Sequence, residues 1–401
     1  MRSTLSVLVG VALFGCHDPV QLSEPRAPSL TADATASAVS YEIIDLGTFG
    51  GSGSALAINA RSQVVGWSEI APGTPHAFLW EDGVMQDLGA LAGGSSWASA
   101  INSRGDIAGV STDAAGAPRA VLWTRGALQD LGPNLAGFNV ATPQKTVFLS
   151  ENGLVVWTAR TPTGPHAQLW DGRQVIDLGT GRAAGVNSRG QVAGTSLSHA
   201  VIWEDGGMRD LGTLGGCCSF ARDINERGQV TGFSFDANGN SHAFLWDGEM
   251  VDLGTLPTDR VSEGHLINER GEVAGVSIRC DACDAWHPFL WDRKRLMQPA
   301  GGPDYLPSSA RDNVEAMNNR GQVVGWREMG PSRHAYLWDG ATRDLGTLGE
   351  PSFFARSRAL AINDRGDIVG FSWAGFSAPT VPVLWRRTPA SPDASAETSG
   401  P

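Results

Sequence analysis

The chain has 401 residues, of which 30 are basic and 42 acidic, giving a formal net charge of −12. An acidic surface repels phosphate backbones, and no basic stripe or glycine-rich phosphate loop offsets it, so we expect no nucleic-acid partner. The length is also large for one compact core and favours an array of repeated units.

The first residues have the features of an export signal. Arg2 supplies a positive end, residues 5–15 form an apolar run too short to span a bilayer, and Cys16 follows a Leu-Phe-Gly sequence as in a lipoprotein cleavage site. We therefore expect a signal peptide at residues 1–16 and lipidation of Cys16, which would anchor the protein to a membrane, facing the periplasm or cell exterior. Secretion without acylation is the alternative, because Phe14 is bulky for this site.

Two terminal segments are rich in Ala, Ser, Pro and Thr and nearly lack residues that could be buried. This composition predicts a disordered tether at residues 17–40 and a disordered tail at residues 388–401. We assign residues 41–387 to a single domain.

A repeat fills this domain. A tryptophan that usually follows leucine recurs at intervals of 33 to 47 residues. In the cleanest copy, residues 242–256, an Asp-Gly turn separates two apolar strands; elsewhere, as in residues 98–109, Asn and Gly delimit a second tight turn. Four short strands with a period in the forties are typical of a β-propeller blade. The recurring tryptophans are Trp80, Trp123, Trp170, Trp203, Trp246, Trp291, Trp338 and Trp385.

The two ends of the domain complement each other. Residues 41–47 match a fourth strand without a third, and residues 383–385 match a third strand without a fourth. We therefore predict an all-β, eight-bladed propeller closed by strands from both termini, with seven blades as the fallback because the third repeat matches poorly. The copies with Ser62 in place of the turn Gly, and with Ser150 in place of the turn Asn, should be the least regular.

The recurrent His-Ala-Phe-Leu-Trp, Asp-Leu-Gly-Thr-Leu-Gly-Gly and Ile-Asn-x-x-Gly-x-Val-x-Gly motifs resemble those of the bacterial extracellular HAF-repeat family over residues 41–387. The resemblance implies an exported repeat protein with a propeller-like fold and no established reaction, and it transfers no catalytic residue. Some copies depart from the motif: Arg119 and Val381 replace His, and Gln168 replaces Phe.

Six histidines share one repeat position. One imidazole per blade would be too far from the next to share a metal ion at about 2 Å, so we expect structural roles and no metal site. The repeated Asp of the fourth strand is expected to fix loops, and the sequence implies no cofactor. The histidines are His76, His166, His199, His242, His287 and His334.

Residues that interrupt the repeat are the better candidates for ligand contact. Irregular connections on one face carry the aromatic residues Trp286, Tyr305, Phe353, Phe354, Trp373 and Phe376, which could grip a ligand or simply pack their loops. An enzyme would instead need acidic residues gathered at the axis, and the candidates are Asp259, Glu263, Asp281, Asp304, Glu315 and Glu328.

Four cysteines follow Cys16, namely Cys217, Cys218, Cys280 and Cys283. An even number in an exported chain favours disulfides. A bridge between adjacent residues would be strained, so a cross-link between the two loops is expected, with a Cys280 to Cys283 bridge as runner-up. A zinc site using Cys280, Cys283 and His287 is the alternative.

The composition and motifs therefore predict a monomeric binding scaffold for an unidentified protein or glycan, with membrane contact only through the lipid. The alternative is a glycan hydrolase or lyase with its site at the mouth of the channel.

Overall fold

The computed structural model describes residues 39–132, 135–138, 146–279, 285–297, 313–330, 332–349, 355–373, 375 and 378–388. Each repeat forms a four-stranded antiparallel meander, because short apolar segments alternate with Asn-to-Gly and Asp-Gly turns. The described strands group into six four-stranded sheets and one eight-stranded sheet. In the eight-stranded sheet, two four-stranded meanders are joined through a single parallel pair, Arg333 with Arg356.

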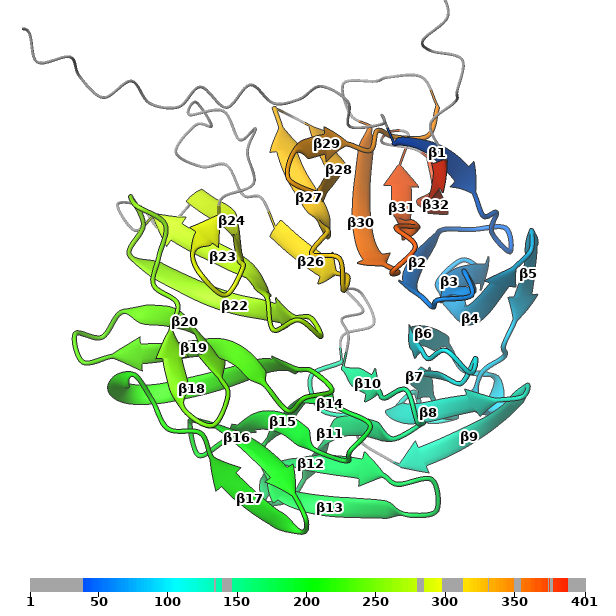
Figure 1. The fold of residues 1–401 in the computed structure, drawn as a ribbon. Helices are drawn as coiled ribbons and strands as arrows, with labels where there is room; N and C mark the ends of the chain where they lie inside the picture. Colours follow the sequence, from blue (N-terminus) through cyan, green and yellow to red (C-terminus); the bar gives the residue numbers. More distant parts are fainter. Residues whose placement is uncertain are drawn as a thin grey trace, which may run out of the picture. The chain divides into compact units, whose positions relative to one another are not determined.

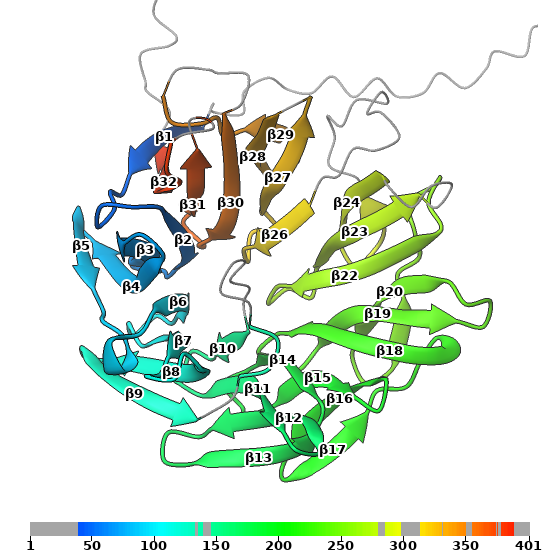
Figure 2. The same cartoon turned by 180° about the vertical axis from the view of Figure 1, so that it is seen from behind.

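The first strand of each four-stranded meander lies innermost, next to the first strands of the neighbouring meanders (Figures 1 and 2). These strands are β2 Gly53–Ile58, β6 Ser96–Ile101, β10 Val147–Leu149, β14 Arg182–Val186, β18 Gly215–Ile224, β22 Val261–Ile267, β26 Asn313–Met317 and β30 Arg356–Ile362. The second strands are β3 Val64–Ala71, β7 Ile107–Thr112, β11 Val155–Thr161, β15 Val192–Ser196, β19 Val230–Asp236, β23 Val273–Arg279, β27 Val323–Met329 and β31 Ile368–Trp373.

The third strands are β4 Thr74–Glu81, β8 Pro118–Thr124, β12 Gly164–Trp170, β16 His199–Glu204, β20 Ser241–Trp246, β24 Ala285–Trp291, β28 Ser332–Trp338 and β32 Val381–Thr388. The outermost strands are β5 Val84–Asp87, β9 Ala127–Gly132, β13 Val175–Thr180, β17 Gly207–Asp210, β21 Met250–Asp252, β25 Leu296–Met297, β29 Thr342–Asp344 and the N-terminal β1 Ser40–Asp45. A 3-10 turn, η1 Leu91–Gly93, precedes β6.

Each sheet packs on the next, and the last sheet packs on the first through β2 and β31. The two ends of the described chain meet in one sheet, where β1 pairs antiparallel with β32 and Ile44 lies opposite Leu384. The predicted pairing of an N-terminal strand with the C-terminal third strand is therefore confirmed. The arrangement is that of a β-propeller.

The hydrophobic core is divided among the interfaces between neighbouring sheets. One cluster joins Leu337 and Leu345 of one four-stranded meander to Ile368 and Trp385 of the next. Six of the eight recurring tryptophans are buried, and Trp170 and Trp291 are partly buried against the same kind of cluster. The indole Nε1 of Trp385 also donates to the carbonyl of Leu345, 2.8 Å away.

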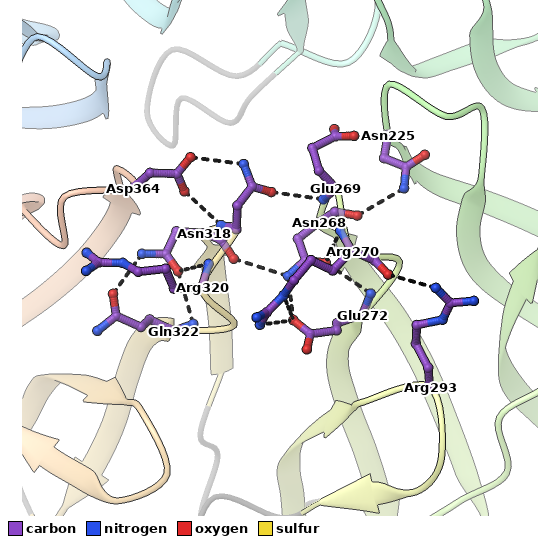
Figure 3. A network of polar contacts seen from close by, with 11 residues as sticks. Asn225, Asn268, Glu269, Arg270, Glu272, Arg293, Asn318, Arg320, Gln322 and Asp364 are labelled. Atoms are coloured by element: carbon purple, nitrogen blue, oxygen red, sulfur yellow. Dashed lines mark hydrogen bonds and ion pairs between the residues drawn. The ribbon is translucent and has the colours of Figure 1, made fainter.

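In seven of the eight described inner-strand turns, an Asn holds its own turn and its side chain contacts the next blade. Asn225 accepts hydrogen bonds at Oδ1 from the amides of Arg227 and Gln229, both at 3.0 Å, and its Nδ2 donates to the carbonyl of Asn268, 3.0 Å away. Asn268 makes the same contact with Asn318, at 3.2 Å (Figure 3). The side-chain hydrogen bonds of the repeated Ile-Asn motif therefore link neighbouring inner strands at one end of the ring.

The two repeated glycines have separate steric reasons. Gly228 closes this turn at φ 81°, a left-handed conformation that favours glycine. Gly232, in the Val-x-Gly part of the motif, crosses the inner strand so closely that a Cβ would overlap the carbonyl oxygen of Phe220. In the first copy Ser62 occupies the turn position at φ 63°, and its hydroxyl donates to Asp367 Oδ2, 2.9 Å away.

Candidate functional site

The repeated histidines each contact a carboxylate, which is a structural role of the kind expected from the sequence. Each Nδ1 lies 2.7 to 2.9 Å from an aspartate oxygen. In five blades the partner is the Asp of the outermost strand, whose other oxygen also accepts the amide two residues later, as Asp252 does from Gly254. Arg119 replaces His in one blade and contacts Asp130 at 2.6 Å. These pairs fix the rim of the propeller.

The exception is His287, whose blade has the two-residue outer strand β25 and no Asp there. Its Nδ1 contacts Asp259 at 2.8 Å, and the Asp259 side chain is fully buried. Asp259 is therefore a structural partner of His287. The expectation that Asp259 could serve as an acid at the axis is corrected accordingly. Among the described residues, no group of three His, Cys, Asp or Glu side chains is placed to hold a metal ion.

The informative departures from the repeat lie on the inner strands. Seven of these eight strands carry a bulge three residues before the terminal Asn or its equivalent. A bulge takes one residue out of the ladder and re-aims its side chain. The bulged residues are Leu56, Ser99, Ala184, Arg222, His265, Glu315 and Leu360. Charged or titratable groups thus occupy this position in three consecutive blades.

A cavity of about 650 Å³ lies over part of this series. The bulged residues Ala184, Arg222 and His265 line it, together with Arg182 at the start of β14 and Phe220 on β18. The β15–β16 turn contributes Leu197, which is 83% exposed. The cavity therefore lies on the face that carries the second-to-third strand connections, where the sequence placed the candidate ligand-contact loops.

Three ionisable groups beside the cavity form one cluster. Glu263 lies 3.4 Å from Arg222 Nη2 and 3.5 Å from His265 Nε2. Burial alone would raise the pKa of Glu263, but the contacts with His265 and Arg222 outweigh it and hold the pKa below its ordinary value. The carboxylate is therefore ionised at neutral pH and contacts both Arg222 and His265.

Aromatic rings of β18 and β19 pack beside this cluster. Phe220 stacks on Phe233 with ring centroids 4.8 Å apart, and Phe233 meets Phe235 edge to face at 6.3 Å. The guanidinium of Arg222 lies 5.2 Å from the Phe233 centroid. The side chain of Arg222 is thus placed by an aromatic ring and a carboxylate together.

A second charged cluster lies between β26, β27 and β30. Glu315 accepts from Arg358 and from the indole Nε1 of Trp326, 3.2 Å away. Arg333 lies over the same Trp326 ring at 4.6 Å and pairs with Glu328 at 3.0 Å. Of the six acidic candidates, only Glu263 and Glu315 therefore lie on inner strands within the described residues, and each is bound to arginine. Asp281 and Asp304 lie outside the described residues.

Two of the six aromatic candidates fall within the described residues. Trp373 is half-buried at the end of β31, its Nε1 donates to the carbonyl of Ala378 at 2.7 Å, and Arg356 lies over its ring. Trp286 is half-buried at the start of β24, opposite Ile278. Neither lines the cavity. Tyr305, Phe353, Phe354 and Phe376 lie outside the described residues.

The cysteine prediction needs a correction. Cys217 and Cys218 form a disulfide with each other instead of a cross-link to the neighbouring loop. The reason is local: between Gly215 and Ser219, strand β18 advances four residues while β19 advances two, from Asp236 to Ser234. The extra residues leave the ladder, so the adjacent side chains can meet. Cys280 and Cys283 lie outside the described residues, as does Cys16.

Four residues that line the cavity were not among the site residues expected from the sequence: Arg182, Phe220, Arg222 and His265. A usable signal existed, because aligning the repeats on the turn Asn shows small or aliphatic residues at the bulge in some blades and Arg, His and Glu in others. Their convergence on one cavity depends on the ring itself. No helix among the described residues is long and apolar enough to cross a membrane.

A scan against models of known protein families finds no match, and a search of curated proteins finds none either. Solved structures similar to this chain include the β-propeller domain of the trilobed protease from Pyrococcus furiosus. It is 10% identical over 76% of this chain and 98% of that chain, with a TM-score of 0.47.

Pyrococcus horikoshii acylaminoacyl peptidase is 13% identical over 83% of this chain, with a TM-score of 0.48, and the match spans only 60% of the peptidase. A variant of the Aleuria aurantia lectin, in complex with Fucα1-6GlcNAc, is 12% identical over 73% of this chain and 96% of that chain, with a TM-score of 0.31. The β-propeller fold follows from this chain's own strand pairing.

Proposed function

We propose that this protein is a non-enzymatic binding module whose ligand occupies the cavity over β14, β18 and β22. The observation that supports this most is the convergence of Arg182, Arg222 and His265, all at positions that vary among the repeats, on one cavity of about 650 Å³. Pockets of this size accommodate small ligands or a short segment of a larger one. The repeated polar residues, in contrast, form hydrogen bonds and ion pairs within and between blades.

An enzyme is the second candidate, and the His265–Glu263 pair is the observation that favours it. A general acid needs a raised pKa, whereas the pKa of Glu263 is lowered. Both oxygens of Asp223 accept backbone amides, from Ile224 at 2.9 Å and Ile267 at 3.0 Å. Among the described residues, no Ser, Thr or Cys side chain hydrogen bonds to His265. These contacts favour binding over turnover.

The number of blades and the localisation of the protein are part of the same proposal. Counting the two halves of the eight-stranded sheet separately gives eight blades, the third repeat included. We assign the protein to the HAF-repeat type on its motifs and expect an exported monomer. Lipidation at Cys16 would make it membrane-anchored, and replacing Cys16 by Ser should then move the protein to the soluble fraction. Unchanged membrane association would reject lipidation.

The binding proposal is tested by filling the cavity. Ala184→Trp places a large side chain at the bulge of β14, and Leu56→Trp makes the same change at the matched position of β2, which does not line the cavity. Both variants and the wild type are applied to glycan and peptide arrays after their thermal unfolding has been compared. Array binding that Ala184→Trp removes and Leu56→Trp retains supports the proposal.

Binding that survives Ala184→Trp would place the ligand elsewhere on the protein. The same arrays also distinguish an enzyme from a binding module. If a bound array ligand is chemically converted, and His265→Gln stops the conversion while binding persists, the protein is an enzyme and the non-enzymatic proposal is wrong.

A further inference from the structure

Among the described residues that line the cavity, one cationic side chain has no ion-pair or hydrogen-bond partner. Arg222 is paired with Glu263, and Asp223 is held by two backbone amides. Arg182, which lines the cavity at the start of β14, has no ion-pair or hydrogen-bond partner for its guanidinium among the described residues. In a chain of net charge −12, an exposed arginine that lines a cavity and lacks an ion-pair partner among the described residues favours an anionic ligand.

The wall around Arg182 is mixed in character. The lining includes the hydroxyl-bearing residues Thr180, Thr195 and Ser198 and the apolar residues Phe220 and Leu197. The lip of the cavity is held in place because the amide of Ser219, on β18, donates to the carbonyl of Ser198 at 2.9 Å. A ligand that suits this wall has hydroxyl groups, an apolar face and a carboxylate or comparable anion.

The strand edges around the cavity do not suit an added peptide strand. β14, β18 and β22 each carry a register shift at the bulge. Strand addition needs a regular row of amides and carbonyls along an edge, and a bulge interrupts that row. The lining therefore favours a compact ligand bound through its side groups.

We propose that the cavity binds an acidic sugar, a uronate residue free or at the end of a glycan, whose carboxylate pairs with Arg182. The planar guanidinium can donate two parallel hydrogen bonds to a carboxylate. The C–H face of the sugar ring packs against Phe220 and Leu197, and the sugar hydroxyls reach Thr180, Thr195 and Ser198. The volume of about 650 Å³ accommodates one or two sugar rings. This inference rests on the proposed binding function.

The test is calorimetric titration of the whole exported chain with D-glucuronate and with its neutral counterpart, D-glucose. Arg182→Gln removes the proposed anchor, and Arg173→Gln, on the exposed β12–β13 turn away from the cavity, removes one equal charge as the control. Loss of a charge-assisted contact should weaken glucuronate binding by about tenfold or more in Arg182→Gln. Arg173→Gln should bind like the wild type, and Arg182→Lys should recover part of the affinity.

Equal binding of glucose and glucuronate, no binding of glucuronate, or unchanged binding in Arg182→Gln would overturn the proposal. Displacement of an array ligand by a peptide with a free C-terminal carboxylate, but not by glucuronate, would replace the sugar by a peptide. In each case, array binding that Ala184→Trp abolishes would leave the proposed binding function standing, so the two claims fail separately.

Discussion

Asn363 donates a hydrogen bond from Nδ2 to the carbonyl oxygen of Asn59, 3.1 Å away and 304 positions earlier in the chain. This contact joins the last inner strand to the first and continues the series that links each turn to the next. In the third repeat, where Ser150 replaces the turn Asn, Asn152 supplies the missing donor to the carbonyl of Ser188 at 2.7 Å. A circle of side-chain amides therefore runs around one end of the propeller.

Removing one member of this circle should destabilise the protein substantially. Asn225→Ala loses a buried donor and a buried acceptor, and we expect the free energy of unfolding to fall by about 2 to 4 kcal/mol. Asn225→Asp keeps the acceptor and loses only the donor, so it should also destabilise. Urea denaturation measures both changes.

The control is Asn238→Ala, in the exposed turn after β19, where we expect a change below about 1 kcal/mol. Equal midpoints for Asn225→Ala and Asn238→Ala would show that the inter-blade contacts contribute nothing beyond a surface turn.

Closure of the ring by β1 predicts a difference between two deletions. Deleting residues 41–47 removes the partner of β32 and takes Ile43, Ile44 and Leu46 out of two core clusters, which should cost about 3 to 6 kcal/mol. Deleting residues 18–38 should leave the unfolding free energy unchanged. Equal losses in the two deletions would contradict closure through β1.

The ion cluster at Glu263 makes stability depend on pH in a defined direction. Its pKa is lowered in the folded protein, so the ionised carboxylate stabilises the fold at neutral pH. That contribution should be lost as the pH falls below the ordinary value of about 4.5 toward the lowered pKa. Between pH 7 and pH 3, Glu263→Gln should therefore lose less thermal stability than the wild type.

The control for this titration is Glu249→Gln, which removes an exposed carboxylate from the β20–β21 turn. It should follow the wild-type pH profile. A Glu263→Gln profile parallel to that of the wild type would mean that the cluster does not couple protonation to folding.

The disulfide predicts a specific product in peptide mapping of unreduced, alkylated protein. Cys217 and Cys218 should be recovered in a single unalkylated peptide that is two hydrogens lighter than its reduced form. Recovery of either residue cross-linked to Cys280 or Cys283 would instead restore the loop-to-loop bridge expected from the sequence.

The blade pattern and its closure could be predicted because local signals determine them. Asn-to-Gly and Asp-Gly turns define the hairpins, and the unmatched strands around Ile44 and Leu384 complete each other. A structural role for the histidines could also be anticipated, since a residue repeated in most copies is more useful to the scaffold than to a single site.

The cavity could not be predicted by the same means. Arg182, Arg222 and His265 are 40 and 43 residues apart in sequence, and their convergence depends on the ring bringing three inner strands together. The bulge that re-aims Arg222 and His265 is a backbone feature with no strong residue signature. The Cys217–Cys218 bond was missed for the same reason, because it requires the irregular start of β18.

Ligand binding in the cavity over β14, β18 and β22 is tested most directly by hydrogen exchange with and without a ligand identified on the arrays. Binding there should slow exchange in peptides covering residues 180–198, 219–224 and 263–267, with little change in the matching segments around β2 and β6. Protection confined to the Asn-containing turns at the opposite end of the inner strands, or spread equally over all blades, would contradict it.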